Sequence, residues 1–252
     1  MNMNLSDFLN TVELSESHKR ILLQSRRIMS IEPHPDDNEI VAGGFISQKL
    51  RDGASFQLVV VSDGRKGSRN LGEEELVRIR KEEQERALDI LGTRNVKFLG
   101  YRDSEVPYPS SLRNDIIKAI RDFGPDLVIS VDPFLPYEVH PDHIHTGLAV
   151  LQAVLFAEFP NIGEGKPVMR PAVALGFTYS PNVIYDCSET FEKKMDAMKA
   201  HRSQFPDNSF IDMVEAVSSI YGRRIGCRYG EAFRVLMPNE LHVNILAGMN
   251  PA

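Results

Sequence analysis

Short apolar runs alternate with longer amphipathic segments along most of this chain. The run Phe56–Val61 is almost continuously apolar, as expected for a strand buried on both faces of a parallel sheet. The charged segment Glu73–Leu91 follows it, with helical spacing and a glycine, Gly92, at its end. This alternation predicts an α/β fold that is Rossmann-like, with a mostly parallel sheet and helices on both faces.

The same pattern predicts the remaining elements. Further strands are expected at Arg27–Glu32, Val96–Leu99, Asp126–Val131, Ala172–Tyr179 and Val183–Tyr185. Further helices are expected at Leu5–Ser25, Asn38–Arg51, Ser110–Phe123, Asp142–Phe159, Glu189–Arg202 and Met213–Gly222. Ser6 would begin the first helix, or Ser15 if that helix is broken. We expect a single domain over 1–252, with 1–25 as an N-terminal helical extension.

Composition narrows the class of protein. The chain has 252 residues and a net charge of −6, which argues against nucleic acid and anionic membranes as partners. The longest apolar run, Gly147–Phe159, is shorter than the ~20 residues that cross a bilayer. The segment 1–20 lacks the features of a signal peptide. Two cysteines outside any Cys-x-x-Cys motif, Cys187 and Cys227, fit a reducing, cytoplasmic location.

Polar clusters follow several of the predicted strands. His34-Pro35-Asp36-Asp37 comes after the strand that ends at Glu32, and His140-Pro141-Asp142-His143 comes after the one that ends at Val131. Ligands of an open parallel sheet bind outside the carboxyl ends of its strands. We therefore expect both clusters at one edge. Two smaller clusters, Ser62-Asp63-Gly64 and Tyr101-Arg102-Asp103, belong at the same edge.

The residue types in the two main clusters point to a catalytic metal, most consistent with zinc. A catalytic zinc has three protein ligands and an open position for water, and His34, Asp37 and His143 would supply two imidazoles and a carboxylate. Neighbouring side chains of an extended backbone diverge, so Asp36 is expected beside the metal, as the base that deprotonates water. His140 would face the substrate and stabilise an oxyanion.

A simpler interpretation assigns these residues to turns and helix caps. Pro35-Asp36-Asp37 can form a turn that caps the next helix, and Asp142 can cap the helix after it. Two His/Asp clusters at two strand-to-helix junctions favour the metal site over capping alone. Capping and ligation are also compatible with each other.

These residues resemble the PIG-L/LmbE-like family of zinc-dependent N-acetylglucosaminyl deacetylases. The two clusters match its two signatures, and the likeness extends from about residue 30 to residue 235. Supporting matches are Gly43-Gly44, Ser62-Asp63-Gly64, Arg80-x-x-Glu83, His201-Arg202-Ser203-Gln204-Phe205 and Gly230-Glu231-Ala232-Phe233-Arg234. Within the family, the chain is most similar to the archaeal diacetylchitobiose deacetylases.

The resemblance implies a function and a set of roles. It implies hydrolysis of the acetamide of N-acetylglucosamine units in small chitin fragments, with one Zn²⁺ per subunit. His34, Asp37 and His143 match the zinc ligands, Asp36 matches the general base, and His140 matches the histidine that stabilises the tetrahedral intermediate. The resemblance also implies that Arg80 and Asp103 hold sugar hydroxyls, that His242 closes a neighbouring subunit's pocket, and that the protein is a homohexamer.

Two other functions compete with this interpretation. One is deacetylation of another N-acetylglucosaminyl conjugate, such as the glucosaminyl-malate of a thiol pathway. Glu138, where relatives acting on thiol-sugar precursors carry a tyrosine, weakens that alternative. The other is a non-catalytic α/β protein that binds a nucleotide or another ligand. The chain has no Gly-x-Gly-x-x-Gly after its first strand and no Gly-x-x-x-x-Gly-Lys, so phosphate binding is unsupported.

Overall fold

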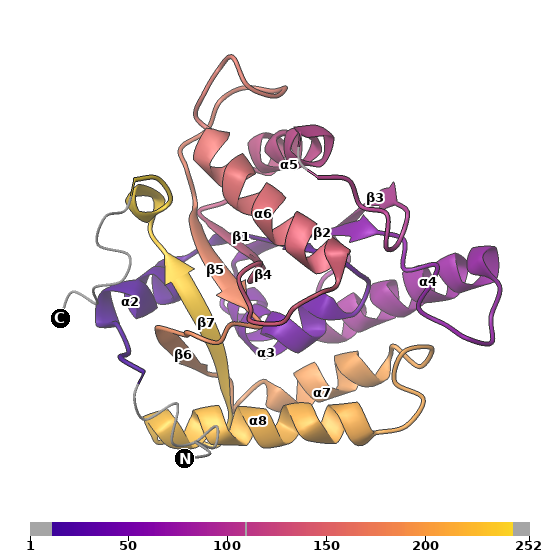
Figure 1. Ribbon diagram of the computed structural model, residues 1–252. Helices are drawn as coiled ribbons and strands as arrows, with labels where there is room; N and C mark the ends of the chain where they lie inside the picture. Colours follow the sequence, from indigo (N-terminus) through magenta and orange to yellow (C-terminus); the bar gives the residue numbers. More distant parts are fainter. Residues whose placement is uncertain (1–11, 109, 244–252) are drawn as a thin grey trace.

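A seven-stranded sheet forms the centre of the computed structural model, which describes residues 12–108 and 110–243 (Figure 1). Its strand order is β3-β2-β1-β4-β5-β7-β6. The neighbours from β3 to β5 pair in parallel, and β7 pairs antiparallel with both β5 and β6. The strands are β1 (Arg27–Glu32), β2 (Ser55–Ser62), β3 (Val96–Tyr101), β4 (Leu127–Val131), β5 (Ala172–Gly176), β6 (Val183–Asp186) and β7 (Gly230–Leu236).

Helices cover both faces of the sheet and enclose two hydrophobic cores (Figure 1). In β1, Ile28 packs in the core that contains Phe45, whereas Met29 packs in the core that contains Val150. Consecutive strand residues point to opposite faces, so a continuously apolar strand fills both cores. The helices are α2 (Glu16–Gln24), α3 (Asp37–Arg51), α4 (Glu73–Leu91), α5 (Ser110–Phe123), α6 (Pro141–Phe156), α7 (Phe191–Lys199), α8 (Ser209–Ile225) and the 3₁₀ turn η1 (Pro238–Glu240).

The strand order reverses between β1 and β4, which are paired in parallel at the middle of the sheet. The chain leaves β1 through α3 toward β2, whereas β4 leads through α6 toward β5. Connections depart in opposite directions at such a switch point, and open α/β sheets bind their ligands there, outside the carboxyl ends of the strands. The segments 33–36 and 132–140 lie at this edge.

The predicted Rossmann-like α/β class is confirmed, while several element boundaries differ. The strand expected at Ala172–Tyr179 ends at Gly176, because Phe177 has a φ of 48° that an extended strand cannot contain. The helix expected from Met213 begins at Ser209, whose backbone N–H donates to the Asp207 side chain. Strand β7 was not predicted.

The N-terminal helix begins after Ser15, as predicted for the case in which the segment Leu5–Ser25 is broken. Ser15 accepts a hydrogen bond from the His18 N–H and begins α2 at Glu16, whereas residues 12–15 are not helical. The part of the predicted extension within 1–11 lies outside the described residues. Among the described helices, none is both long and apolar enough to cross a membrane.

Candidate active site

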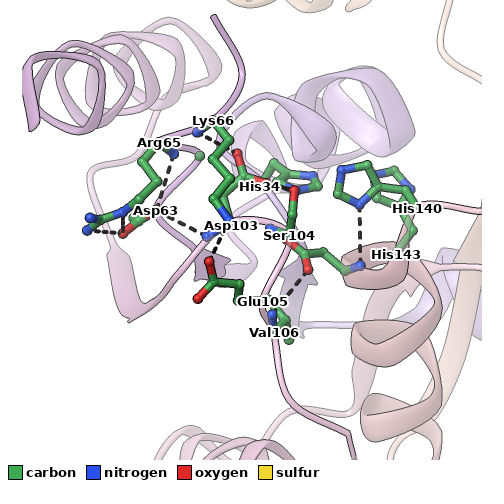
Figure 2. A network of polar contacts seen from close by, with 12 residues as sticks. His34, Asp63, Arg65, Lys66, Asp103, Ser104, Glu105, Val106, His140 and His143 are labelled. Carbon is green, nitrogen blue, oxygen red and sulfur yellow. Dashed lines mark hydrogen bonds and ion pairs between the residues drawn. The ribbon is translucent and has the colours of Figure 1, made fainter. Parts of the chain in front are cut away.

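The two polar clusters meet at the carboxyl-end edge of the sheet, as predicted from their positions in the sequence, and this meeting point is the switch point between β1 and β4. His34 follows β1, Asp37 begins α3, and His143 lies in the first turn of α6. The Asp37 Oδ2 atom is 3.3 Å from His34 Nδ1 and 3.7 Å from His143 Nε2. One donor atom from each residue lies within 4.8 Å of the others. We call these three residues the His–Asp–His group; His34 and His143 are seen beside His140 in Figure 2.

Carboxylates fix the orientation of His34. Its Nδ1 atom faces Asp37, while its Nε2 atom is 3.2 Å from Asp142 Oδ2 and 3.5 Å from Asp103 Oδ1. Burial acts to lower the pKa of His34, but hydrogen bonds to Asp103, Asp142 and Asp37 raise it well above its usual value. Carboxylates that hold the second nitrogen of a metal-binding histidine fix its tautomer and its ring. Asp142, expected as a helix cap, lies in the position of such a carboxylate behind His34.

The other two histidines are also held by their neighbours. His143 Nδ1 is 3.4 Å from Glu138 Oε2, which leaves Nε2 toward Asp37. His140 Nδ1 accepts a hydrogen bond from the Asp142 N–H, so in the neutral imidazole the proton belongs on Nε2. Burial and the charges of His34 and His143 lower the pKa of His140. His140 is therefore a neutral hydrogen-bond donor beside the His–Asp–His group. The centroids of the His140 and His34 rings are 4.7 Å apart.

Asp36 and Asp37 are neighbours with different environments. Burial acts to raise the pKa of Asp37, but the charge of His143 and the hydrogen bond and charge of His34 lower it to about 2. Burial raises the pKa of Asp36 to about 6, against the opposing charge of Arg80. Asp36 has a φ of 119°, a strained conformation for a residue with a side chain. Asp37 thus suits a metal ligand, and Asp36 suits a proton acceptor.

Helix α4 holds the strained backbone at Asp36 in place. Arg80 donates to the carbonyl oxygens of Pro35 and Gly64 at 2.6 and 3.1 Å, and to Asp36 Oδ2 at 3.1 Å. Gln84 Oε1 accepts from the Asp36 N–H. Gly64 has a φ of 66°, and a Cβ there would approach Arg80 Nη1 to 2.6 Å. The Ser62-Asp63-Gly64 motif therefore provides room for this arginine.

Arg80 contacts Asp36, and Asp103 contacts His34 of the His–Asp–His group. Both residues are almost fully buried, with 3% of each exposed. Asp103 accepts from the Lys66 N–H and the Ser104 hydroxyl, as Figure 2 shows. Glu83, which could have held Arg80 one turn away, accepts instead from Ser203. Both predicted substrate residues thus have partners within the protein, and their contact with sugar stays a prediction.

His242 lies away from the His–Asp–His group of its own chain. It is exposed and follows η1, after the end of β7. Because β7 runs antiparallel to β5, with Leu236 opposite Val173, it ends at the edge where the parallel strands begin. The end of β7, after which His242 follows, therefore lies at the opposite edge of the sheet from the His–Asp–His group. The predicted contribution to a neighbouring subunit stays a prediction.

Two residues that contact the predicted site residues or their neighbours were missed in the sequence. Glu138 was considered only for substrate choice, yet it contacts His143 and accepts from the His140 N–H at 2.7 Å. Glu39 forms a buried ion pair with His201 at 3.0 Å and accepts from Gln84. An acidic residue two positions before His140 was the available signal for Glu138. No pattern in the sequence pairs Glu39 with His201.

The donors of the His–Asp–His group fit a divalent metal ion. Two imidazole nitrogens and a carboxylate oxygen converge, and carboxylates hold both histidines from behind. This is the set of ligands and supporting contacts expected of a catalytic zinc-type site. The fold and the site together are those of a metal-dependent hydrolase with a Rossmann-like α/β fold.

Comparisons with known proteins agree with this class. Residues 29–154 match the model of the PIG-L family, GlcNAc-PI de-N-acetylase. The diacetylchitobiose deacetylase of Thermococcus kodakarensis is 34% identical over 229 residues, covering 86% of each chain. A probable N-acetyl-alpha-D-glucosaminyl L-malate deacetylase 2 of Bacillus anthracis is 34% identical, covering 71% of this chain and 82% of its own. The structure of the N,N'-diacetylchitobiose deacetylase of Pyrococcus horikoshii superposes with a TM-score of 0.86 at 33% identity, covering 99% of both chains.

The chain belongs to the PIG-L family and is an N-deacetylase. Deacetylases of this family depend on a metal ion. Within the described residues, the His–Asp–His group offers the donors for one.

Proposed function

We propose that this enzyme removes the acetyl group from N-acetylglucosamine units of small chitooligosaccharides, such as diacetylchitobiose, with one Zn²⁺ per subunit. The observation that carries the proposal is the convergence of His34, Asp37 and His143 with Asp36 beside them. The similarity to the Thermococcus and Pyrococcus deacetylases over most of the chain supports the choice of substrate. Zinc is proposed because two imidazoles and one carboxylate are a common ligand set for that metal.

The bound metal would act as a Lewis acid on the acetamide carbonyl and would increase the acidity of water. Asp36 accepts a proton from the attacking water, which its pKa of about 6 allows near neutral pH. His140 donates its Nε2–H to the oxygen that becomes negatively charged in the tetrahedral intermediate. Asp36 then returns the proton to the amine as the C–N bond breaks. Acetate and a free amino sugar are the products.

The remaining predicted roles form part of the same proposal. Arg80 and Asp103 would reach the sugar hydroxyls from the walls of the site, beside the base and behind His34. His242 would close the pocket of a neighbouring subunit in a homohexamer. We further propose that 1–252 works as one deacetylase domain with an N-terminal extension over 1–25, and that its two cysteines act as free thiols in the cytoplasm.

A second candidate substrate is an N-acetylglucosaminyl malate conjugate. The Bacillus anthracis relative favours it, because its identity to this chain equals that of the Thermococcus enzyme, over a smaller share of the chain. The two substrates share the acetamide on which the proposed metal site would act and differ in the group that remains on the sugar.

Acetate release from a panel of N-acetylated sugars, with and without a chelator, tests the proposal. We expect turnover of diacetylchitobiose that the chelator abolishes and Zn²⁺ restores. Faster release from the malate conjugate would establish the second candidate. Undiminished release in the chelator, or no release together with a melting temperature raised by a nucleotide, would refute the proposed function.

A further inference from the structure

Helix α3, which begins with the proposed ligand Asp37, is broken in the middle. Ala42 has φ −145° and ψ 18°, outside the helical range. In a continuous helix the Gly44 N–H donates to the Ile40 carbonyl, and the Phe45 N–H donates to the Val41 carbonyl. Backbone groups at a buried break need other partners, since an unpaired polar group is unfavourable away from water.

An ion pair from two distant segments supplies these partners. The Gly44 N–H donates to Glu231 Oε1 at 2.9 Å, and the Phe45 N–H donates to Glu231 Oε2 at 2.7 Å. Lys194 Nζ is 2.8 Å from Glu231 Oε1 and donates to the Ile40 carbonyl at 2.8 Å. A chain of three contacts through Glu231 and Lys194 thus connects the Gly44 N–H with the Ile40 carbonyl, the two groups that an unbroken helix pairs directly.

The surroundings of this ion pair fit it closely. Only 2% of the Lys194 side chain and 1% of the Glu231 side chain are exposed. A Cβ on Gly43 would lie 3.2 Å from Lys194 Cγ, and one on Gly44 would lie 2.7 Å from Cys187 Cβ. The paired glycines therefore let α7 and the segment before it approach the break. Glu231 and Lys194 both lie beyond residues 29–154, which match the family model.

We propose that Lys194 and Glu231 are positioning residues for the metal site, an assignment that rests on the proposed function. The first turn of α3 carries Asp37 at its beginning and Ile40 at its end. His34 holds the beginning, because its N–H donates to Asp37 Oδ2 at 2.9 Å. The Lys194–Glu231 pair holds the other end through Ile40 and joins it to the rest of the helix. The direction of this turn, and with it the position of the Asp37 carboxylate, depends on the pair.

Zinc affinity of two variants and a matched control tests this role. K194M and E231Q each break the chain of contacts but keep the size of the side chain. K49M is the control, because Lys49 is also buried on α3 and donates to a backbone carbonyl, that of Leu23, far from Asp37. We expect Zn²⁺ affinity, measured by competition with a chromophoric chelator, to fall roughly 10- to 100-fold in K194M and E231Q, and to change less than about twofold in K49M.

A second measurement uses the wild-type chain, so its result does not depend on whether the variants fold. Because coupling between two sites is reciprocal, Zn²⁺ binding should slow hydrogen exchange at the Gly44 and Phe45 amides. Unchanged exchange at both amides on metal binding would overturn the positioning role. So would wild-type affinity in both variants, or an equal loss of affinity in K49M. A wild-type chain that binds no Zn²⁺ would refute the proposed metal site and the positioning role with it.

Discussion

Arg80 Nη2 lies 3.1 Å from Asp36 Oδ2, so a buried guanidinium on α4 is paired directly with the proposed base. The same nitrogen donates to the Pro35 carbonyl, just before Asp36. Arg80 therefore holds both the carboxylate and the backbone of this segment. The charge of Arg80 also lowers the pKa of Asp36, but burial has the larger effect and raises this pKa to about 6. The result is a carboxylate that is ionised at neutral pH but accepts a proton readily.

Replacing Asp36 with asparagine should abolish most turnover while leaving metal binding intact. Asparagine keeps the size of the side chain and tolerates a positive φ better than alanine does. Loss of a general base lowers kcat by about 10²- to 10⁴-fold. Steady-state kinetics together with elemental analysis of zinc will check both parts. Full activity of the variant would contradict the assignment of the base.

Replacing Arg80 with methionine should move the acid limb of the pH–rate profile to higher pH. Arg80 makes the largest contribution that lowers the pKa of Asp36, ahead of His201 and His34, so its loss weakens the opposition to burial and keeps the base protonated up to a higher pH. The profile of kcat/KM from pH 5 to 9 measures this shift. K81M, which removes an exposed cation one position along α4, should leave the profile unchanged. A raised KM with an unshifted limb would indicate that Arg80 serves only to bind the sugar.

The meeting of His34 and His143 could be predicted because it depends only on topology. Each follows a parallel strand that a short apolar run identifies, and the carboxyl ends of parallel strands share one edge. The buried, continuously apolar strands likewise predicted the sheet. Strand β7 was missed because its alternation of buried and partly exposed residues is short and begins with Gly230.

The contacts behind the ligands could not be predicted from local patterns. Asp142 has the position of a helix cap, and only the folded chain shows that it bonds His34 from α6. Lys194 and Glu231 belong to different elements, and both contact α3 at its break. No helix-propensity rule predicts that this break falls at Ala42. Such contacts depend on the distance between elements far apart in the sequence.

Alanine at His34 or at His143 should prevent stoichiometric zinc binding. Each substitution removes one of three converging donors and leaves the Asp37 carboxylate with a single imidazole. Elemental analysis after dialysis against Zn²⁺ measures the loss. His145 provides a matched control two residues along α6, because its Nδ1 bonds the Val106 carbonyl and not the His–Asp–His group. Full zinc content in both ligand variants would refute the ligand set.

Zinc binding should release a proton near pH 7. Hydrogen bonds to Asp103, Asp142 and Asp37 outweigh burial and raise the pKa of His34 well above its usual value, so the metal-free chain holds a protonated imidazole. A metal ligand must be deprotonated, and affinity should therefore fall as pH falls through this pKa. Isothermal titration calorimetry in buffers of different ionisation enthalpy should give about one proton per zinc.

Two further results bear on this proton. The variant D103N removes one carboxylate that stabilises protonated His34. It should therefore release fewer protons per bound zinc than the wild-type chain at pH 7. Binding without any proton release, at an affinity that is independent of pH from 6 to 8, would contradict the state assigned to His34.

Replacing Glu32 with glutamine should make the protein less sensitive to alkaline pH. Glu32 is fully buried at the end of β1, and it accepts a hydrogen bond from the Ser30 hydroxyl at 2.8 Å. Its Oε2 atom has no partner among the described residues. Burial, with a smaller contribution from the charge of Asp37, raises the pKa of Glu32 well above its usual value.

The sign of the effect follows from this raised pKa. The stability that the protonated form contributes is fully present below the unfolded pKa of about 4.3, and it is lost as pH rises through the folded pKa. Each pH unit between the two values corresponds to about 1.4 kcal/mol. E32Q cannot ionise, so its free energy of unfolding should fall less between pH 5 and pH 9 than that of the wild-type chain. Urea denaturation at both pH values measures this difference. The control is E189Q, because Glu189 is exposed. An equal fall in the free energy of unfolding of E32Q and of the wild-type chain would contradict the prediction.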